Sequence, residues 1–236
     1  MFTYLLINLF VILVPLLFSF DTRVAFYTRW KYSLPAIVLG SGPFLVWDIW
    51  FAHKGFWGFT SDYILGSYFW GLPLEEWFFF IAIPYAGIFT YNVINSYFPL
   101  NVSYSELCKP ICLGLALVTF FFLAIGKGGI YTVFSLAFVL VIIALVFIIP
   151  VLRPFTLKFL RFYAILLVPF LLVNGILTGM FLEKPVVWYH PEAILGIRII
   201  TIPLEDVFFG LALMYLILLF YELFQANLKR SNYAWI

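Results

Sequence analysis

Long apolar stretches recur seven times along the chain, and the short connections between them carry most of the charged residues. A helix that spans a bilayer needs roughly 20 mostly apolar residues, and each stretch comes close to that length or exceeds it. The pattern therefore predicts an all-α, polytopic membrane protein. The seven predicted transmembrane helices are Phe2–Phe20, Leu34–Phe51, Leu72–Ile94, Leu107–Ile125, Ile130–Pro150, Leu160–Leu182 and Ile199–Phe224.

The residues at which the third and seventh helices begin depend on how two prolines are interpreted. Apolar residues also precede Pro73 and Pro203, in "ILGSYFWG" and "AILGIRII". Proline is favoured in the first turn of a helix, whereas inside a helix it removes a hydrogen bond and produces a kink. The sequence thus predicts either helices that open at these prolines or longer helices that bend there.

The composition excludes a soluble domain and a nucleic-acid binder. Hydrophobic residues make up 65% of the chain and charged residues only 10%, against about 25% charged in soluble domains. The net charge of +2 comes from scattered basic residues rather than a basic face. The first apolar run follows no basic segment and precedes no small-residue cleavage signal, so it is interpreted as a retained helix. Cys108 and Cys112 share one helix face and are interpreted as packing residues, and no metal site is predicted.

Lysine and arginine are distributed unequally between the two sides of the predicted bundle. One side carries nine: Arg23, Arg29, Lys31, Lys109, Arg153, Lys158, Arg161, Lys229 and Arg230. The other side carries four: Lys54, Lys127, Lys184 and Arg198. The more basic side is expected to face the cytoplasm. This orientation places the N-terminus outside the cell membrane and the C-terminus in the cytoplasm.

A short motif occurs twice, 130 positions apart. "PLEE" at 73–76 recurs as "PLED" at 203–206, "ILG" precedes each copy, and two phenylalanines follow each copy. The repetition predicts two copies of one three-helix unit, at 1–100 and 129–236. A linking helix within 101–128 makes both copies run in the same direction, related by an axis along the membrane normal.

The two motifs place four acids, Glu75, Glu76, Glu205 and Asp206, at the same depth in apolar surroundings. Acids after a proline are also a common helix start, favoured by the helix dipole. However, ionisable groups within a membrane are costly and usually functional, so we interpret these four as catalytic. Four carboxyls in a poorly solvated cavity cannot all be ionised, and the cavity is expected to hold a proton that a general acid can deliver. Neighbouring helix residues lie about 100° apart, so one acid of each pair should face the site.

Further candidate residues lie near the acids in each copy. Asp48 is expected to be a cavity acid, with pairing to Lys54 as the alternative; Asn174 either lines the cavity or bonds a neighbouring helix. Arg198 either pairs with an acid or extends into the interface, and the second interpretation is preferred. Aromatic faces stabilise cations. The substrate-binding candidates are therefore Asp48, Asn174, Trp47, Trp77, Phe79 and Phe209.

With its repeated Pro-Leu-Glu-Glu/Asp motifs, each followed by two phenylalanines, the chain resembles the integral-membrane lycopene cyclase family, as a fused tandem of two domains. The resemblance implies that the four acids convert the linear ends of lycopene into β-ionone rings, giving γ-carotene and then β-carotene. It implies lycopene and related linear carotenoids as partners, together with membrane lipid, and other carotenoid-pathway enzymes as candidate partners.

The implied reaction adds one proton and removes another without net redox change, so no cofactor is predicted. Glu75 or Glu205 is expected to protonate the substrate, and a carboxylate of the other copy to stabilise the cation or take the final proton. A carotenoid hydratase, which quenches the same cation with water, is an alternative, and so is a proton-translocating transporter. A prenyltransferase is disfavoured because the chain has no D-x-x-x-D motif. A retinal protein is disfavoured because the last predicted helix has no lysine at its middle.

Overall fold

The computed structural model describes residues 2–100, 106–125 and 129–233, and side chains as far as residue 226. Parts of the predicted linking segment, and Lys127 with them, lie outside the described residues. So do the side chains of Lys229 and Arg230, which entered the prediction of orientation.

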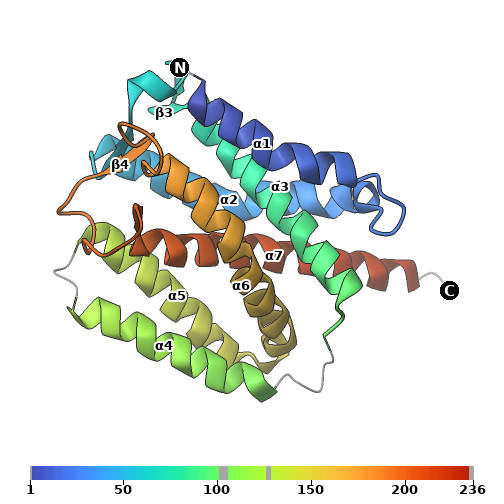
Figure 1. The fold of residues 1–236 in the computed structure, drawn as a ribbon. Coiled ribbons are helices and arrows are strands. Elements are labelled where there is room, and N and C mark those ends of the chain that lie inside the picture. Colours follow the sequence, from blue (N-terminus) through green and yellow to red (C-terminus); the bar gives the residue numbers. More distant parts are fainter. Residues whose placement is uncertain (1, 101–105, 126–128, 234–236) are drawn as a thin grey trace.

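The predicted all-α fold is confirmed, because the described residues form seven α-helices (Figure 1). Six of them are long and apolar enough to cross a membrane; α1, with 16 residues, is shorter than the roughly 20 expected. The helices are α1 (Thr3–Phe18), α2 (Trp30–His53), α3 (Leu74–Tyr97), α4 (Cys108–Ile125), α5 (Ile130–Ile148), α6 (Arg153–Leu177) and α7 (Leu204–Tyr233).

The predicted bounds of three helices are wrong by several residues. The seventh runs over Leu204–Tyr233 instead of Ile199–Phe224, because the hairpin that ends at Pro203 comes before it. The second helix begins at Trp30 instead of Leu34, because a 3₁₀ turn over Phe26–Arg29 leads directly into it. The sixth begins seven residues early, at Arg153, with a proline in its first turn, where the missing N–H is harmless. It ends at Leu177, before Gly179, which has a φ of +113°. That backbone conformation terminates a helix and is open mainly to glycine.

Both motif prolines open a helix rather than bend one. Pro73 and Pro203 each end a two-stranded hairpin, and α3 and α7 begin at the next residue. The two hairpins share one register, with Tyr68 opposite Pro73 and Arg198 opposite Pro203. Hydrophobic pattern alone did not predict them, since two-residue strands are too short to show a period. The strands are β1 (Trp57–Phe59), β2 (Tyr68–Phe69), β3 (Leu72–Pro73), β4 (Val187–Tyr189), β5 (Arg198–Ile199) and β6 (Ile202–Pro203).

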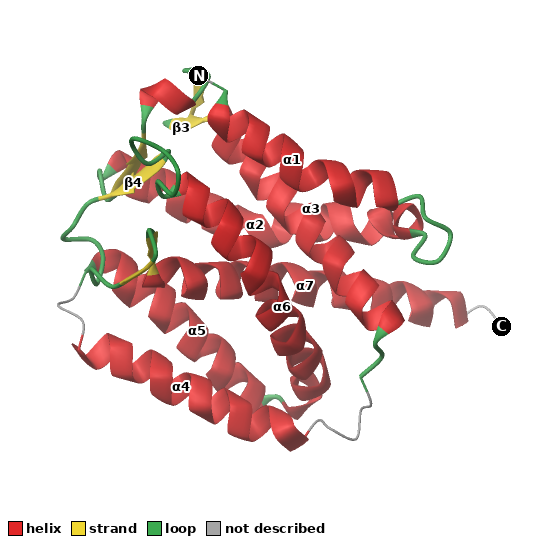
Figure 2. Ribbon diagram, viewed as in Figure 1, coloured by secondary structure: helices red, strands yellow, loops and turns green. Residues whose placement is uncertain are grey.

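The helices of the two halves pack in the same way. α1 packs against α3 as α5 packs against α7, and α2 packs against α7 as α6 packs against α3. α4 lies at one edge, against α5 and α6, and reverses the chain so that α3 and α7 run in the same direction (Figure 1). The strands gather at the end of the bundle where α1 begins (Figure 2). This arrangement suits a duplicated unit; the boundaries proposed for the repeats stay a prediction.

Two reciprocal hydrogen bonds hold α3 beside α7. The Tyr91 hydroxyl donates to Oε1 of Glu222 at 2.7 Å, and the Tyr221 hydroxyl donates to Oδ1 of Asn92 at 2.8 Å. The two tyrosines are themselves 130 positions apart, like the acidic motifs. Because buried polar groups must be satisfied by each other in apolar surroundings, these bonds fix the spacing and rotation of the two helices that carry the acids.

Candidate active site

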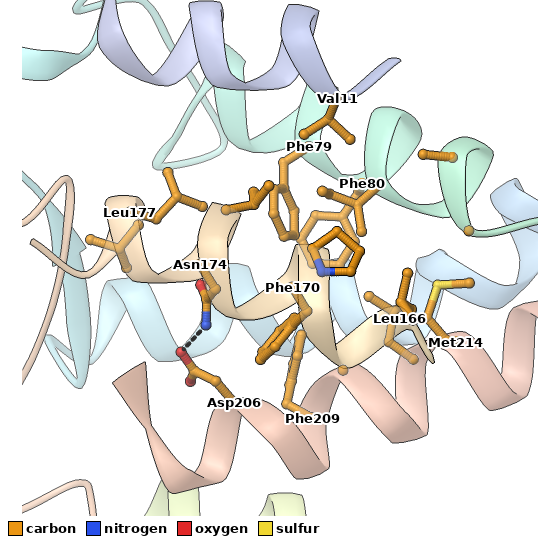
Figure 3. A pocket seen from close by; sticks show the side chains of 18 of the residues that line it. Val11, Phe79, Phe80, Leu166, Phe170, Asn174, Leu177, Asp206, Phe209 and Met214 are labelled. Carbon is orange, nitrogen blue, oxygen red and sulfur yellow. Dashed lines mark hydrogen bonds between the residues drawn. The ribbon is translucent and has the colours of Figure 1, made fainter. Parts of the chain in front are cut away.

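A cavity of ≈ 340 Å³ lies between the two halves, and its walls are mostly apolar. Figure 3 shows Asn174 and Asp206 at one end, Phe170 and Phe209 beside them, and Leu166 and Met214 farther along. The cavity thus has a polar end, near the starts of α3 and α7, and a long apolar arm. The residues that form the polar end are Tyr4, Asp48, Glu76, Tyr131, Asn174, Tyr189 and Asp206.

Glu76 is the acid of the first motif that lines the cavity. Its side chain is buried, and its Oε2 accepts a hydrogen bond from the Tyr4 hydroxyl of α1. The carboxyl of Asp48, on α2, is only 3% exposed, lines the same cavity and is close enough to interact with that of Glu76. Asp48 thus lines the cavity, whereas Lys54 lies exposed at the helix end.

Asp206 is the acid of the second motif that lines the cavity, and its carboxyl accepts hydrogen bonds from three side chains. The Tyr131 hydroxyl donates to Oδ1 at 2.8 Å, while Asn174 Nδ2 and the Tyr189 hydroxyl donate to Oδ2 at 2.8 and 2.9 Å. Tyr189 lies in β4, outside the spanning helices. Burial, and next the charge of Asp206, raise the pKa of Tyr189 well above its ordinary value, so its hydroxyl keeps the proton that it donates.

Glu75 and Glu205, although buried, do not line the cavity among the described residues. Glu75 Oε1 accepts from the Leu65 amide at 2.6 Å, and Glu205 Oε1 accepts from the Leu195 amide at 2.5 Å. Neither Glu75 nor Glu205, the two acids expected to protonate the substrate, therefore lies at the cavity wall. One step along a helix turns a side chain by about 100°, which directs these two acids to the connections before the hairpins.

The aromatic candidates divide between the cavity and its surroundings. Phe79 and Phe209 line the cavity (Figure 3), as expected for substrate-binding residues. Trp47 lies one layer behind, with its ring 5.1 Å from that of Phe209. Trp77 was placed wrongly, because its Nε1 donates to the Phe69 carbonyl at 3.1 Å and its ring packs on the outer hairpin. Trp77 is one residue beyond Glu76 on the same helix, so its side chain is rotated by about 100° and points in a different direction.

Sequence reasoning missed the tyrosines that bind the acids. Tyr4 and Tyr131 begin the first helix of each half and lie 72 and 75 positions before Glu76 and Asp206. This similar spacing is a sequence signal that could have identified both tyrosines, because it places them at matching positions in the first helix of each half. Tyr189 had no such signal, since it belongs to a connection whose course the pattern does not predict.

Strands from both halves cover the polar end of the cavity. β1 pairs with β4 in antiparallel register, with Trp57 opposite Tyr189. The Thr60 amide extends this pairing by donating to the Val186 carbonyl at 2.9 Å. Trp57 and Tyr189 both line the cavity below. The pairing thus closes the end of the bundle over the acids and separates them from the water outside.

The apolar arm runs from the acids along α3 to Thr90 and along α7 to Met214. Phe10 and Val14 on α1, and Leu172 on α6, line the arm and are themselves at least half exposed on the outside of the bundle. The arm therefore opens between α1 and α6, toward the lipid that surrounds the bundle.

The hydrogen bonds accepted by Glu75 and Glu205 lead to a prediction about the stability of the protein. Replacing either residue with alanine removes the acceptor for a partly buried backbone amide, which costs about 1–3 kcal/mol of unfolding free energy. We expect Glu75→Ala and Glu205→Ala to unfold at a clearly lower temperature in detergent than the exposed control Glu183→Ala. Equal melting temperatures in all three would show that these carboxylates do not hold the connections.

A family model described as lycopene cyclase matches residues 1–94 and 128–224. The two matched segments contain both acidic motifs and every residue of the polar end of the cavity. No curated protein and no solved structure gives a significant match. Since the family model covers well over half of the chain, the chain belongs to the lycopene cyclase family.

Proposed function

We propose that the protein is a lycopene β-cyclase that closes the linear ends of lycopene into β-ionone rings by acid catalysis, giving γ-carotene and then β-carotene. Its family supports a lycopene cyclase activity and a carotenoid substrate in general. The observation that supports the finer proposal is a set of hydrogen-bonded carboxyls at the covered end of an apolar cavity that opens between helices.

The reaction needs only proton transfer and a shielded cation. A carboxylic acid O–H adds its proton to the terminal C=C bond, which leaves a tertiary carbocation. The π electrons of the nearby internal alkene attack that cation and form the ring C–C bond. Loss of a proton from the adjacent ring carbon restores an alkene. Atoms and electrons balance without an oxidant or reductant, so the proposed reaction is an isomerisation that requires no cofactor.

We assign the acid and base to Glu76 and Asp206, the motif acids that line the cavity, in place of Glu75 and Glu205. The ring faces of Phe79 and Phe209 lie along the same walls and can stabilise the cation. The covering strands restrict water, which favours ring closure over quenching to an alcohol. The polyene occupies the apolar arm, having entered sideways from lipid between α1 and α6.

We further propose that the end bearing the strands faces outward and that the N-terminus is outside. Lys54, Lys184 and Arg198 belong to that end, whereas the more basic connections belong to the other end. The two halves, 1–100 and 129–236, then act as a duplicated unit that contributes one cavity acid each.

Expression in a lycopene-accumulating host tests the proposed function. We expect lycopene to decline while γ-carotene appears first and β-carotene accumulates, because each molecule has two ends to close. In D₂O, each new ring should carry one deuterium from the initiating protonation. Unchanged lycopene beside correctly inserted protein would contradict the proposal. Hydroxylated carotenoid would indicate a hydratase, and proton flux in carotenoid-free liposomes would indicate a transporter.

A further inference from the structure

The two cavity acids have different surroundings, although their motifs are nearly identical. Both oxygens of Asp206 accept hydrogen bonds, from three neutral donors in total. Hydrogen bonds donated to a carboxylate favour its charged form. The donors come from α5, α6 and β4, so packing from three directions prepares this site for an anion.

Among the described residues, the Glu76 carboxyl accepts a hydrogen bond from one donor and has an acidic neighbour. Tyr4 donates to its Oε2, and the Asp48 carboxyl lies close by, beside Trp57. Oδ2 of Asp48 is fully buried and has no hydrogen-bond partner among the described residues. Two neighbouring carboxyls in poorly solvated surroundings cannot both be ionised, so one of them keeps a proton.

A nearby cation could remove the need for that proton, but the described lining residues of the cavity include no lysine, arginine or histidine. The ion pairs found within the described part of the chain, Lys109–Glu106 and Lys184–Asp62, are at exposed positions elsewhere. The negative charge of the pair is therefore reduced by protonation rather than by an ion pair.

We infer that Asp48 is a further catalytic residue, which shares with Glu76 the proton that starts cyclisation, while Asp206 is kept as the anion that accepts the final proton. This inference rests on the proposed function for its chemistry. The O–H bond of the Asp48–Glu76 pair breaks as the C–H bond forms at the terminal alkene carbon. After ring closure, an Asp206 oxygen takes the proton from the ring carbon, and the C–H electrons become the new C=C bond.

The pair must regain a proton after each ring closure. Tyr189 donates to Asp206, and the charges of Asp48 and Glu76 also act on its hydroxyl, so it is the side chain through which the inferred return of the proton would pass. Its hydroxyl can pass its own proton to the pair while it takes the one that Asp206 gained. One cycle thus restores every group and leaves the substrate isomerised.

Infrared difference spectra of the purified protein test where the proton is held, independently of turnover. We expect Asp48→Asn and Glu76→Gln each to lose a carbonyl stretching band of a protonated carboxyl. Asp206→Asn should keep that band and lose a carboxylate band. Asp48→Glu, which retains a carboxyl, should keep the protonated band, and Asp62→Asn is the control for an exposed acid.

Pigment analysis of the same variants tests the role in turnover. Asp48→Asn should reduce ring formation at least about tenfold, and Asp48→Glu should restore part of it. An unchanged protonated band in Asp48→Asn, or loss of that band in Asp206→Asn, would overturn the inference. If the wild-type protein makes no rings although the bands behave as expected, the proposed function fails while the location of the proton stands.

Discussion

Glu76→Gln should abolish β-carotene formation in a lycopene-accumulating host, and Asp206→Asn should do the same. Glutamine and asparagine fill the same volumes but can neither deliver nor accept the required proton. General acid and base catalysis contributes about 10²- to 10⁴-fold each, so we expect ring formation to drop by at least about 100-fold. Chromatography of extracted pigments measures the effect as the ratio of cyclic to linear carotenoid.

The matched control is Glu183→Gln, which makes the same chemical change at an exposed position. It should convert lycopene as the wild-type protein does, and all three variants should reach the membrane in similar amounts. Glu76→Gln with wild-type conversion would remove this acid from the mechanism. Glu75→Gln distinguishes the two motif acids, because its carboxyl binds the Leu65 amide rather than facing the cavity.

Ala86→Phe should block substrate binding while leaving the acids in place. Ala86 lines the apolar arm and lies ten residues beyond Glu76 on α3, about 15 Å at 1.5 Å per residue. A phenyl ring there fills the arm and leaves no room for the polyene behind the reacting end. We expect conversion to fall at least about tenfold, since the cost of overpacking is typically 1–3 kcal/mol.

Ile81→Phe is the control for this variant. Ile81 lies on the same helix but is 49% exposed on the outer surface, away from the lining of the cavity. The Ile81→Phe variant should bind and convert lycopene as the wild-type protein does. If Ala86→Phe also converted lycopene at the wild-type rate, the polyene would have to lie somewhere other than the described arm.

Under the proposed mechanism, a duplicated unit would let one fold provide both an acid and a base. Two copies that run in the same direction bring Glu76 and Asp206 to the same end of one cavity, which neither copy would enclose alone. The same scaffold then allows different partners: a second carboxyl beside Glu76, and an amide and two hydroxyls around Asp206. Environment rather than residue type separates acid from base in such sites.

Several features of the site could be predicted from local sequence. Acids within apolar stretches stand out because each is costly there, and Asp48, Asn174, Phe79 and Phe209 followed from their positions near those acids. The misplacement of Trp77 has a simple reason. A tryptophan adjacent to a site acid in sequence faces elsewhere on a helix, where it packs on an outer hairpin.

The sequence by itself determined the seven helices, the duplicated motif and the presence of costly carboxyls, because apolar length and buried charge are local properties of the chain. Only the tertiary structure decided which acid of each motif faces the cavity and which tyrosines bind it. These outcomes depend on how each helix is rotated about its axis and on contacts between residues more than 70 positions apart. Such rotation is set by packing against neighbouring helices, which no single stretch of sequence contains.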